Sequence, residues 1–295
     1  MKEFEYLLFR AAVWIAKNLS DRNLFRISSF FKWIVYRVIA YRKDVVLKNL
    51  KASFPARSNA ELNIISSQYY QNLCDIIFET FASYHWSVDK MKEHFIFINP
   101  DLLKEEKYKE TTFIGISGHI GNFELGAVLV PFHLGIASFA VYRPLANKKI
   151  NDYILEQRNR TGLKFLNSLH LRSLLQDMPS PSILFLLADQ NPTNIEKAFW
   201  VNFLQQDTAF VHGPATLSKE LNAPIVFFDT QRVSRGIYQT ELSILIEEPS
   251  SLTAEEITQI IAKKLEQNII QRPDDWLWSH KRWKWQRVNN IPVRV

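Results

Sequence analysis

The part of the chain after residue 90 alternates between short apolar runs typical of β-strands and amphipathic patterns typical of helices. The strand-like runs are Phe95–Ile98, Thr112–Ser117, Ile136–Tyr142, Leu163–Asn167, Ser182–Ala188, Pro224–Val233 and Tyr238–Ile246. The helical patterns are Glu124–Phe132, Lys148–Arg160, Leu171–Met178, Gly213–Leu221 and Thr253–Gln271. This alternation predicts an α/β fold with a mostly parallel or mixed sheet, flanked by helices and ending in an antiparallel hairpin.

The length and composition favour one catalytic domain with an N-terminal helical appendage. The chain has 295 residues, 47% of them hydrophobic, and no repeat or Ser/Gly-rich linker interrupts it. We place the boundary after residue 42, so that residues 1–42 form the appendage and residues 43–295 the domain. The single cysteine, Cys74, excludes an intramolecular disulfide and lies in a helical pattern, where it is expected to pack in the core.

The positive charge of the chain is concentrated at its N-terminus. The net charge is +6, and residues 1–55 contain eleven Lys or Arg against four acidic residues, which gives +7 there and −1 over the remainder. A basic segment on an otherwise balanced chain indicates an anionic partner for that segment and argues against a nucleic-acid-binding surface over the whole molecule.

Two basic amphipathic helices fit the first forty residues. In the first helix, one face carries Phe4, Leu7, Leu8, Ala11, Trp14, Ile15 and Leu19, and in the second, Leu24, Ile27, Phe31, Ile34, Val35 and Val38 share a face. Such helices are typical of binding at a membrane interface, and packing into the core is the alternative. No apolar run reaches the ~18–20 residues that a membrane-spanning helix needs.

A histidine and a glutamate five positions apart flank a glycine turn at the end of one strand. His119 and Glu124 lie in the segment Ser117-Gly118-His119-Ile120-Gly121-Asn122-Phe123-Glu124. A histidine titrates near neutral pH and can remove a proton from an alcohol, while a carboxylate fixes its tautomer. Because residues five apart point away from each other on a helix, the pair can meet only if the glycines bend the chain. The alternative is a loop histidine followed by a glutamate placed for the helix dipole.

Other polar residues follow strand ends in the same way. Arg143 follows Tyr142, and Asp189 follows Ala188. Sites in α/β sheets cluster at the carboxyl ends of the strands, so these residues are expected near His119. Each has a structural alternative: Arg143 can pair with a strand-end acid such as Asp189, and Asp189 can be a cap or an ion-pair partner.

Four ordered blocks resemble the bacterial lipid A biosynthesis acyltransferases, the late lauroyl/myristoyl transferase family. The blocks are the segment from Ser117 to Glu124, Val141-Tyr142-Arg143-Pro144, Ala188-Asp189-Gln190 and Trp278-Ser279-His280-Lys281-Arg282-Trp283-Lys284. Asn49-Leu50 and Ser53-Phe54-Pro55 extend the resemblance toward the N-terminus. Several ordered blocks over most of the chain are more specific than any single motif.

The resemblance implies a glycerolipid acyltransferase-like fold and acyl transfer from an acyl carrier protein thioester to a hydroxyl of a lipid A precursor. His119 would remove the proton of the hydroxyl and Glu124 would stabilise His119, so both are expected to be catalytic. Backbone N–H groups near Gly121 and Asn122 would bind the oxyanion. Substrate contacts are expected from Arg143, Asp189, Gln190, Asn122 and Arg282, whereas the Trp residues of the last block are expected to be structural.

The resemblance also implies a location at the cytoplasmic face of the bacterial inner membrane, where the N-terminus meets anionic lipid. No cofactor and no metal requirement are expected. The N-terminal helices contain more charge than the single spanning helix common in the family. Three alternatives remain open: acyl-CoA as donor or another glycolipid or aminolipid as acceptor, a thioesterase using the same residues, and a membrane-binding protein whose site has decayed.

Overall fold

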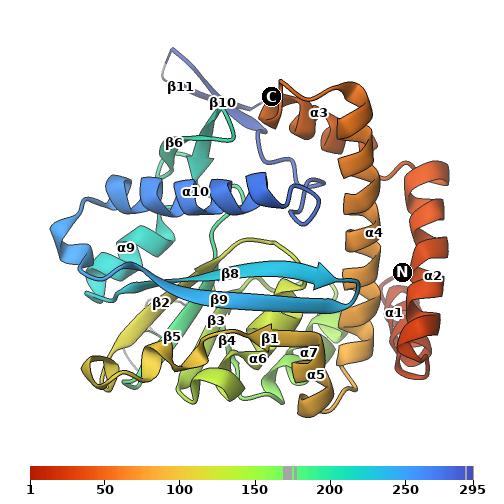
Figure 1. Cartoon of the computed structure of the whole chain (residues 1–295), viewed down its shortest axis with the longest axis horizontal. Coiled ribbons are helices and arrows are strands. Elements are labelled where there is room, and N and C mark those ends of the chain that lie inside the picture. Colours follow the sequence, from red (N-terminus) through yellow and green to blue (C-terminus); the bar gives the residue numbers. More distant parts are fainter. Residues whose placement is uncertain (169–174, 176–177, 290, 295) are drawn as a thin grey trace.

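The computed structural model describes residues 1–168, 175, 178–289 and 291–294 and has the predicted α/β architecture (Figure 1). A seven-stranded sheet in the order β1-β9-β8-β2-β5-β3-β4 lies between two helical layers. The helix predicted over Leu171–Met178 lies largely outside the described residues.

The strands of the central sheet coincide closely with the predicted runs. They are β1 (Phe95–Phe97), β2 (Thr112–Ser117), β3 (Ala137–Tyr142), β4 (Lys164–Asn167), β5 (Ser182–Leu187), β8 (Ile225–Ser234) and β9 (Ile237–Ile246). Strands β8, β2, β5, β3 and β4 are parallel, and β9 pairs antiparallel with β8 as the predicted hairpin. β1 then pairs parallel with β9, which makes the sheet mixed.

Helices cover both faces of the sheet. On one face lie α5 (Val88–His94), α6 (Phe123–Leu134) and α7 (Lys148–Asn159), and on the other lie α9 (Gly213–Glu220) and α10 (Ala254–Gln271) (Figure 1). The central strands β2 and β5 are buried along nearly their whole length because helices cover both sides. The carboxyl ends of the parallel strands therefore form the exposed edge at which a site can open.

The N-terminal helices lie along α4, a 25-residue helix that runs beside the sheet (Figure 1). They are α1 (Lys2–Lys17) and α2 (Asp21–Trp33), with one π-helical turn at Ile34–Val38. After them come α3 (Lys43–Ser53) and α4 (Asn59–Ser83). None of the helices in the described part of the chain is long and apolar enough to cross a membrane.

An ion-pair network attaches α2 and α4 to the sheet. The buried Asp75 of α4 accepts a hydrogen bond from Ser28 of α2 and pairs with Arg232 and Arg235, which lie at the β8–β9 turn. Burial acts to raise the pKa of Asp75, but the Arg235, Ser28 and Arg232 contacts outweigh it and lower this pKa below its usual value. A charged carboxylate at this point therefore ties the N-terminal helices to the domain.

Two small hairpins complete the fold. They are β6 (Phe199–Phe203) with β7 (Gln206–Phe210), and β10 (Trp285–Val288) with β11 (Ile291–Arg294). The segment between α10 and β10 carries the last of the four motif blocks. Trp278 of this block is buried, and Trp276 is buried just before it.

Candidate active site

His119 and Asp189 meet at the carboxyl edge of the sheet. The Nδ1 atom of His119 lies 2.7 Å from Oδ1 of Asp189, and the backbone N–H of His119 donates to Oδ2 at 2.8 Å. The strand register explains the meeting, because Ser117 of β2 pairs with Leu187 of β5 and each partner lies two residues beyond that pair. The ends of two parallel strands thus place a base and a carboxylate in contact.

Gly118 leaves space for this contact. A Cβ atom at this position would lie 3.1 Å from Cδ2 of Leu265 and 3.3 Å from Oδ2 of Asp189. Gly121 has φ of +55°, so the chain turns there into α6 in a conformation that other residues rarely adopt. The sequence predicts that the glycines bend the chain so that His119 can meet Glu124, but the loop brings His119 to Asp189 instead.

Asp189 is held as a carboxylate. Its Oδ2 also accepts a hydrogen bond of 2.7 Å from Nε1 of Trp276. Burial acts to raise the pKa of Asp189, but His119, its two hydrogen bonds and the Trp276 bond outweigh burial and lower the pKa to about 2. Trp276 is a site residue that the sequence analysis did not single out.

The contact with Asp189 also raises the pKa of His119. Burial acts to lower the pKa of His119, but the charge of Asp189, the hydrogen bond to it and the charge of Glu124 together raise the pKa above its usual value. With Asp189 ionised, Nδ1 of the neutral ring is the donor and Nε2 carries the free lone pair. Gln190 occupies that position, with its Nε2 donating to His119 Nε2 at 2.9 Å.

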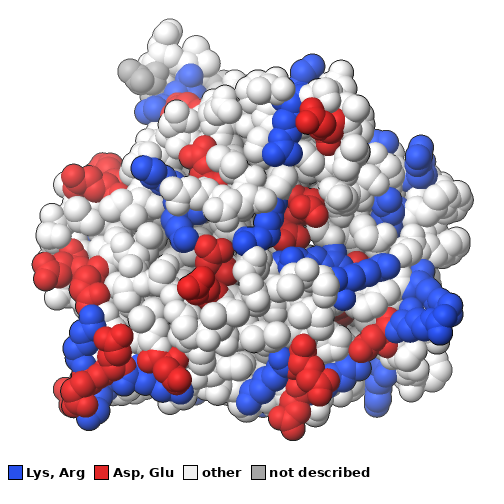
Figure 2. Space-filling model, viewed as in Figure 1, with Lys and Arg blue, Asp and Glu red and all other residues white. Residues whose placement is uncertain are grey.

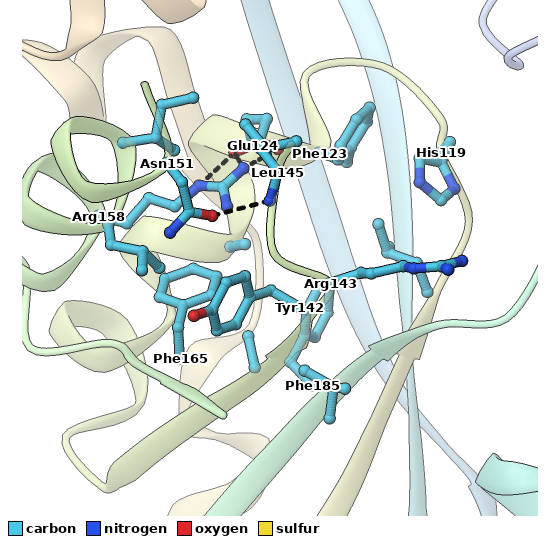
Figure 3. Close-up of a pocket in the computed structure, with 16 residues that line it drawn as sticks. His119, Phe123, Glu124, Tyr142, Arg143, Leu145, Asn151, Arg158, Phe165 and Phe185 are labelled. Carbon is cyan, nitrogen blue, oxygen red and sulfur yellow. Dashed lines mark hydrogen bonds and ion pairs between the residues drawn. The ribbon is translucent and has the colours of Figure 1, made fainter. Parts of the chain in front are cut away.

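Glu124 has a different partner from the one predicted. Its carboxylate forms bidentate hydrogen bonds of 2.5 to 3.0 Å with Arg158 of α7, and Figure 3 shows it pointing to Arg158. The Arg158 guanidinium also lies 5.0 Å from the centre of the Phe165 ring. The expected His119–Glu124 contact is therefore wrong: residues five apart diverge at the start of α6, and a neighbouring helix supplies a cation for Glu124.

Asn122 and Gly121 are engaged in the structure of the loop. Asn122 is fully buried; its Oδ1 accepts from the backbone of Leu125 to cap α6, and its Nδ2 donates to the buried Glu79. The N–H of Gly121 donates to the carbonyl of Asp275. A substrate contact from the Asn122 side chain and an oxyanion contact from Gly121 are thus both wrong.

Arg143 remains available for substrate. It is exposed, and in the described part of the chain its guanidinium has neither an ion pair nor a hydrogen-bond partner. The alternative of an Arg143–Asp189 pair does not occur, because Asp189 binds His119 and Trp276. His119 and Arg143 lie at the same end of the pocket in Figure 3.

Arg282 is a core residue. Its side chain is 1% exposed, donates to the carbonyl of Ala209 at 2.7 Å and lies 4.5 Å from the centre of the Phe210 ring. Burial lowers the pKa of Arg282 to about 9, although the charge of Asp189 acts in the opposite direction. The predicted substrate contact is wrong because the β6–β7 hairpin covers this side chain.

The pocket beside His119 has a volume of about 260 Å³ and lies between α6, α7 and the ends of β3, β4 and β5. Its walls are largely apolar and aromatic, with Phe123, Phe165, Phe185 and Leu187 among them. Its polar lining residues include His119 and Arg143 at one end, the Glu124–Arg158 pair farther along, and Tyr142 and Asn151 (Figure 3). No three His, Cys, Asp or Glu side chains gather as metal ligands among the residues that the structure describes.

Nearly the whole chain matches a known protein family. Residues 2–285 match the family model described as bacterial lipid A biosynthesis acyltransferase. The chain belongs to this family. It is therefore an acyltransferase, and the resemblance seen in the four motif blocks is confirmed.

Characterised members of this acyltransferase family align along most of the chain. The lipid A biosynthesis lauroyltransferase of Escherichia coli (strain K12) is 21% identical over 283 residues, which cover 96% of this chain and 92% of the relative. The lipid A biosynthesis palmitoleoyltransferase of the same strain is 21% identical over 258 residues, 86% of this chain and 82% of the relative. A lipid A biosynthesis acyltransferase of Shigella flexneri aligns to the same extent.

Proposed function

We propose that this acyltransferase moves a fatty acyl chain from an acyl carrier protein thioester to a hydroxyl of a lipid A precursor, with His119 as the general base. The observation that supports this most strongly is the contact between His119 Nδ1 and the ionised Asp189, beside an apolar pocket. The contact leaves Nε2 as a proton acceptor, and general-base catalysis requires such an acceptor within reach of the substrate hydroxyl.

The reaction proceeds without an enzyme nucleophile. The acceptor hydroxyl displaces the Gln190 amide from His119 Nε2, and its oxygen attacks the thioester carbonyl as His119 takes the proton. The tetrahedral intermediate then expels the thiolate, and His119 returns the proton to the sulfur, which yields an ester and a free thiol. Asp189 stabilises the imidazolium between the two proton transfers.

Arg143 and the apolar pocket serve the thioester. Arg143 lies at the His119 end of the pocket, is unpaired among the residues that the structure describes, and stabilises the negative charge that develops on the carbonyl oxygen. The acyl chain lies against the wall formed by Phe123, Phe165 and Phe185. The Glu124–Arg158 pair keeps the two helices that line the pocket, α6 and α7, at a fixed distance.

The exposed side of α1 and α2 supports binding to an anionic membrane, at the cytoplasmic face of the inner membrane. Val13 and Ala16 pack inward and are 1% exposed, whereas Trp14 is 68% exposed. The α1–α2 surface is defined by the exposed apolar residues Phe4, Leu7, Leu8, Trp14, Ile15, Phe30, Phe31 and Trp33. Figure 2 shows basic side chains along the edge formed by these helices, in keeping with the exposed Arg10, Lys17, Arg22, Arg26 and Arg37. Residues 1–42 would thus seat the domain 43–295 on the lipid that contains its acceptor.

Incubation of the full-length protein with radiolabelled acyl carrier protein thioester and a detergent-dispersed lipid A precursor tests the proposal. Transfer of label to the lipid is expected, and the His119→Ala variant should lower the rate by roughly 10²–10⁴. Release of free fatty acid by the wild type without labelled lipid would instead indicate a thioesterase. Parallel reactions with acyl-CoA identify the donor.

A further inference from the structure

A second groove has a different chemistry from the apolar pocket. It has a volume of about 280 Å³ and lies between α3, the start of β7 and the segment that precedes and enters β10. Its lining includes Lys48, Asn49, Gln206, Lys281, Trp283 and Lys284. We call it the lysine groove.

The lysine groove carries an uncompensated positive charge. Lys48, Lys281 and Lys284 line it, and the one acidic residue in its lining is Asp44. In the described part of the chain the ammonium groups of these three lysines have no hydrogen-bond or ion-pair partner, whereas Lys90 and Lys264 pair with aspartates. Cations that converge on a concave site without counter-charges favour the binding of an anion.

The frame of the lysine groove is fixed by buried hydrogen bonds. Asn49 of α3 donates to the carbonyls of Trp278 and His280 at 2.9 and 3.0 Å. Nε1 of Trp283 donates to Oγ1 of Thr208 at 2.8 Å. These bonds hold α3, β7 and the closing segment together, so the lysines project from a preformed surface.

The groove is joined to His119 through two adjacent residues. Gln190 contacts His119 Nε2, and its neighbour Asn191 donates from Nδ2 to the carbonyl of Lys281 at 2.8 Å. The same Asn191 amide lies 2.8 Å from Nε2 of His280. The closing segment that contains Lys281 is thus hydrogen-bonded to the loop that places Gln190 at His119, so the lysine groove and the active site are built on the same framework.

We propose that the lysine groove binds a phosphate or carboxylate on the sugar headgroup of the acyl acceptor. The inference rests on the proposed function and adds the contact that holds the acceptor. Lysines bind phosphate as point charges, and the groove has the size of a small-molecule site with an aromatic wall at Trp283. The donor also contains a phosphate in its prosthetic group, so the experiment must separate the two substrates.

Binding of small sugars tests the groove without any acyl transfer. The full-length protein is titrated with N-acetylglucosamine 1-phosphate and with N-acetylglucosamine, and binding is followed by calorimetry or by ligand-observed NMR. The phosphorylated sugar should bind more tightly, and the Lys281→Gln/Lys284→Gln double variant should weaken its binding by about tenfold or more. The matched control is Lys51→Gln, since Lys51 is also exposed on α3 but does not line the groove.

Steady-state kinetics then assigns the anion to one substrate. In the Lys281→Gln and Lys284→Gln variants, the KM for a phosphorylated lipid A precursor should rise by a larger factor than kcat falls. The KM for the thioester donor should stay near the wild-type value. The Lys284→Arg variant should keep more affinity for the acceptor than Lys284→Gln. Equal binding of the neutral sugar, or phosphosugar binding that does not depend on Lys281 and Lys284, would overturn the proposal. So would a rise in donor KM with unchanged acceptor KM. Absence of transfer by the wild type would refute the proposed function and leave the sugar titration as an independent result.

Discussion

His119 Nδ1 lies 2.7 Å from Asp189 Oδ1, although seventy positions separate the two residues in the chain. The parallel pairing of β2 with β5 creates this contact, and Trp276 supports it from the closing segment. Glu124, which is much closer to His119 in sequence, forms an ion pair with Arg158. The carboxylate that serves the base is therefore determined by the topology of the sheet.

The Glu124–Arg158 pair should behave as one structural unit. Both side chains are mostly buried, so removal of either charge leaves the other without a partner. Glu124→Gln and Arg158→Gln should each lower the free energy of unfolding, and the double variant should cost less than the sum of the two, with a coupling of about 1–3 kcal/mol. Urea unfolding of the four proteins measures this coupling. Additive effects would show that the two side chains act independently.

The α1–α2 surface should bind anionic vesicles through its exposed aromatic residues. Removal of residues 1–42 would also remove the packing on α4, so point substitutions are the better test. A Trp14→Ser/Phe30→Ser/Trp33→Ser variant should weaken co-sedimentation with anionic vesicles by about tenfold or more, because each large side chain contributes on the order of 1.5–3 kcal/mol when buried in lipid. High salt should weaken wild-type binding only in part.

The control for this surface is Ile98→Ser, which removes an exposed apolar side chain near β1. That variant should sediment like the wild type. If the triple variant did so as well, the membrane contact would lie elsewhere on the protein.

Asp75 should contribute strongly to stability at neutral pH. Its carboxylate is buried against Arg232 and Arg235, and Asp75→Asn leaves both cations without their counter-charge. The expected loss is on the order of 3–5 kcal/mol. The pKa of Asp75 is lowered on folding, so its contribution is present above the unfolded-state pKa of about 3.9 and is lost as the pH falls through the folded-state value.

Denaturant unfolding at pH 7 and at pH 3 measures this effect. The difference between wild type and Asp75→Asn should be smaller at pH 3. The matched control, Asp101→Asn, removes a carboxylate from an exposed pair with Lys104 and should change stability little. The prediction would be wrong if Asp75→Asn lowered the free energy of unfolding no more than Asp101→Asn does.

Glu79 should make the protein less stable as the pH rises from about 4.5 to 7. Burial raises the pKa of Glu79 to about 7, while its bonds with Tyr238 and Asn122 offset part of that rise. A group whose pKa is raised on folding contributes its stability below the unfolded-state pKa and loses it as the pH rises through the folded-state value. Glu79→Gln should remove this loss, which amounts to at most about 3 kcal/mol. Identical pH dependence of the unfolding free energy in the variant and the wild type would contradict the burial of a titrating carboxyl.

Much of the sheet could be predicted because its strands are apolar runs bounded by polar turns. All the strands expected from Phe95 to Ile246 occur, and no boundary differs from the expected one by more than one residue. The β6–β7 hairpin was not predicted. Its turn consists of Leu204 and Gln205, both with positive φ, so the glycine or asparagine that usually marks such a turn is absent.

The sequence placed part of the candidate site at one edge of the sheet, but it did not predict the contacts within it. His119, Asp189, Arg143 and Gln190 lie together because each follows a strand end, which the sequence reveals. The pairing of His119 with Asp189 depends on strand order, which no local spacing encodes. Burial of Arg282 depends on the unpredicted hairpin that covers it.

The pH dependence of acyl transfer by the Asp189→Asn variant tests the central role of the His119–Asp189 pair most directly. Single-turnover rates of wild type, Asp189→Asn and Glu124→Gln are measured between pH 5 and 9. The wild-type rate should rise with pH through a midpoint above about 6.5, because a general base must be neutral and the pKa of His119 is raised.

Asp189→Asn should lower the rate by roughly 10²–10⁴ and move the midpoint to lower pH, because His119 loses the charge that stabilises its protonated form. Glu124→Gln should move the midpoint much less, since Glu124 acts on His119 only through its charge. The contrary result would be a wild-type rate and midpoint in Asp189→Asn with a shifted midpoint in Glu124→Gln. Glu124, and not Asp189, would then be the partner of the base.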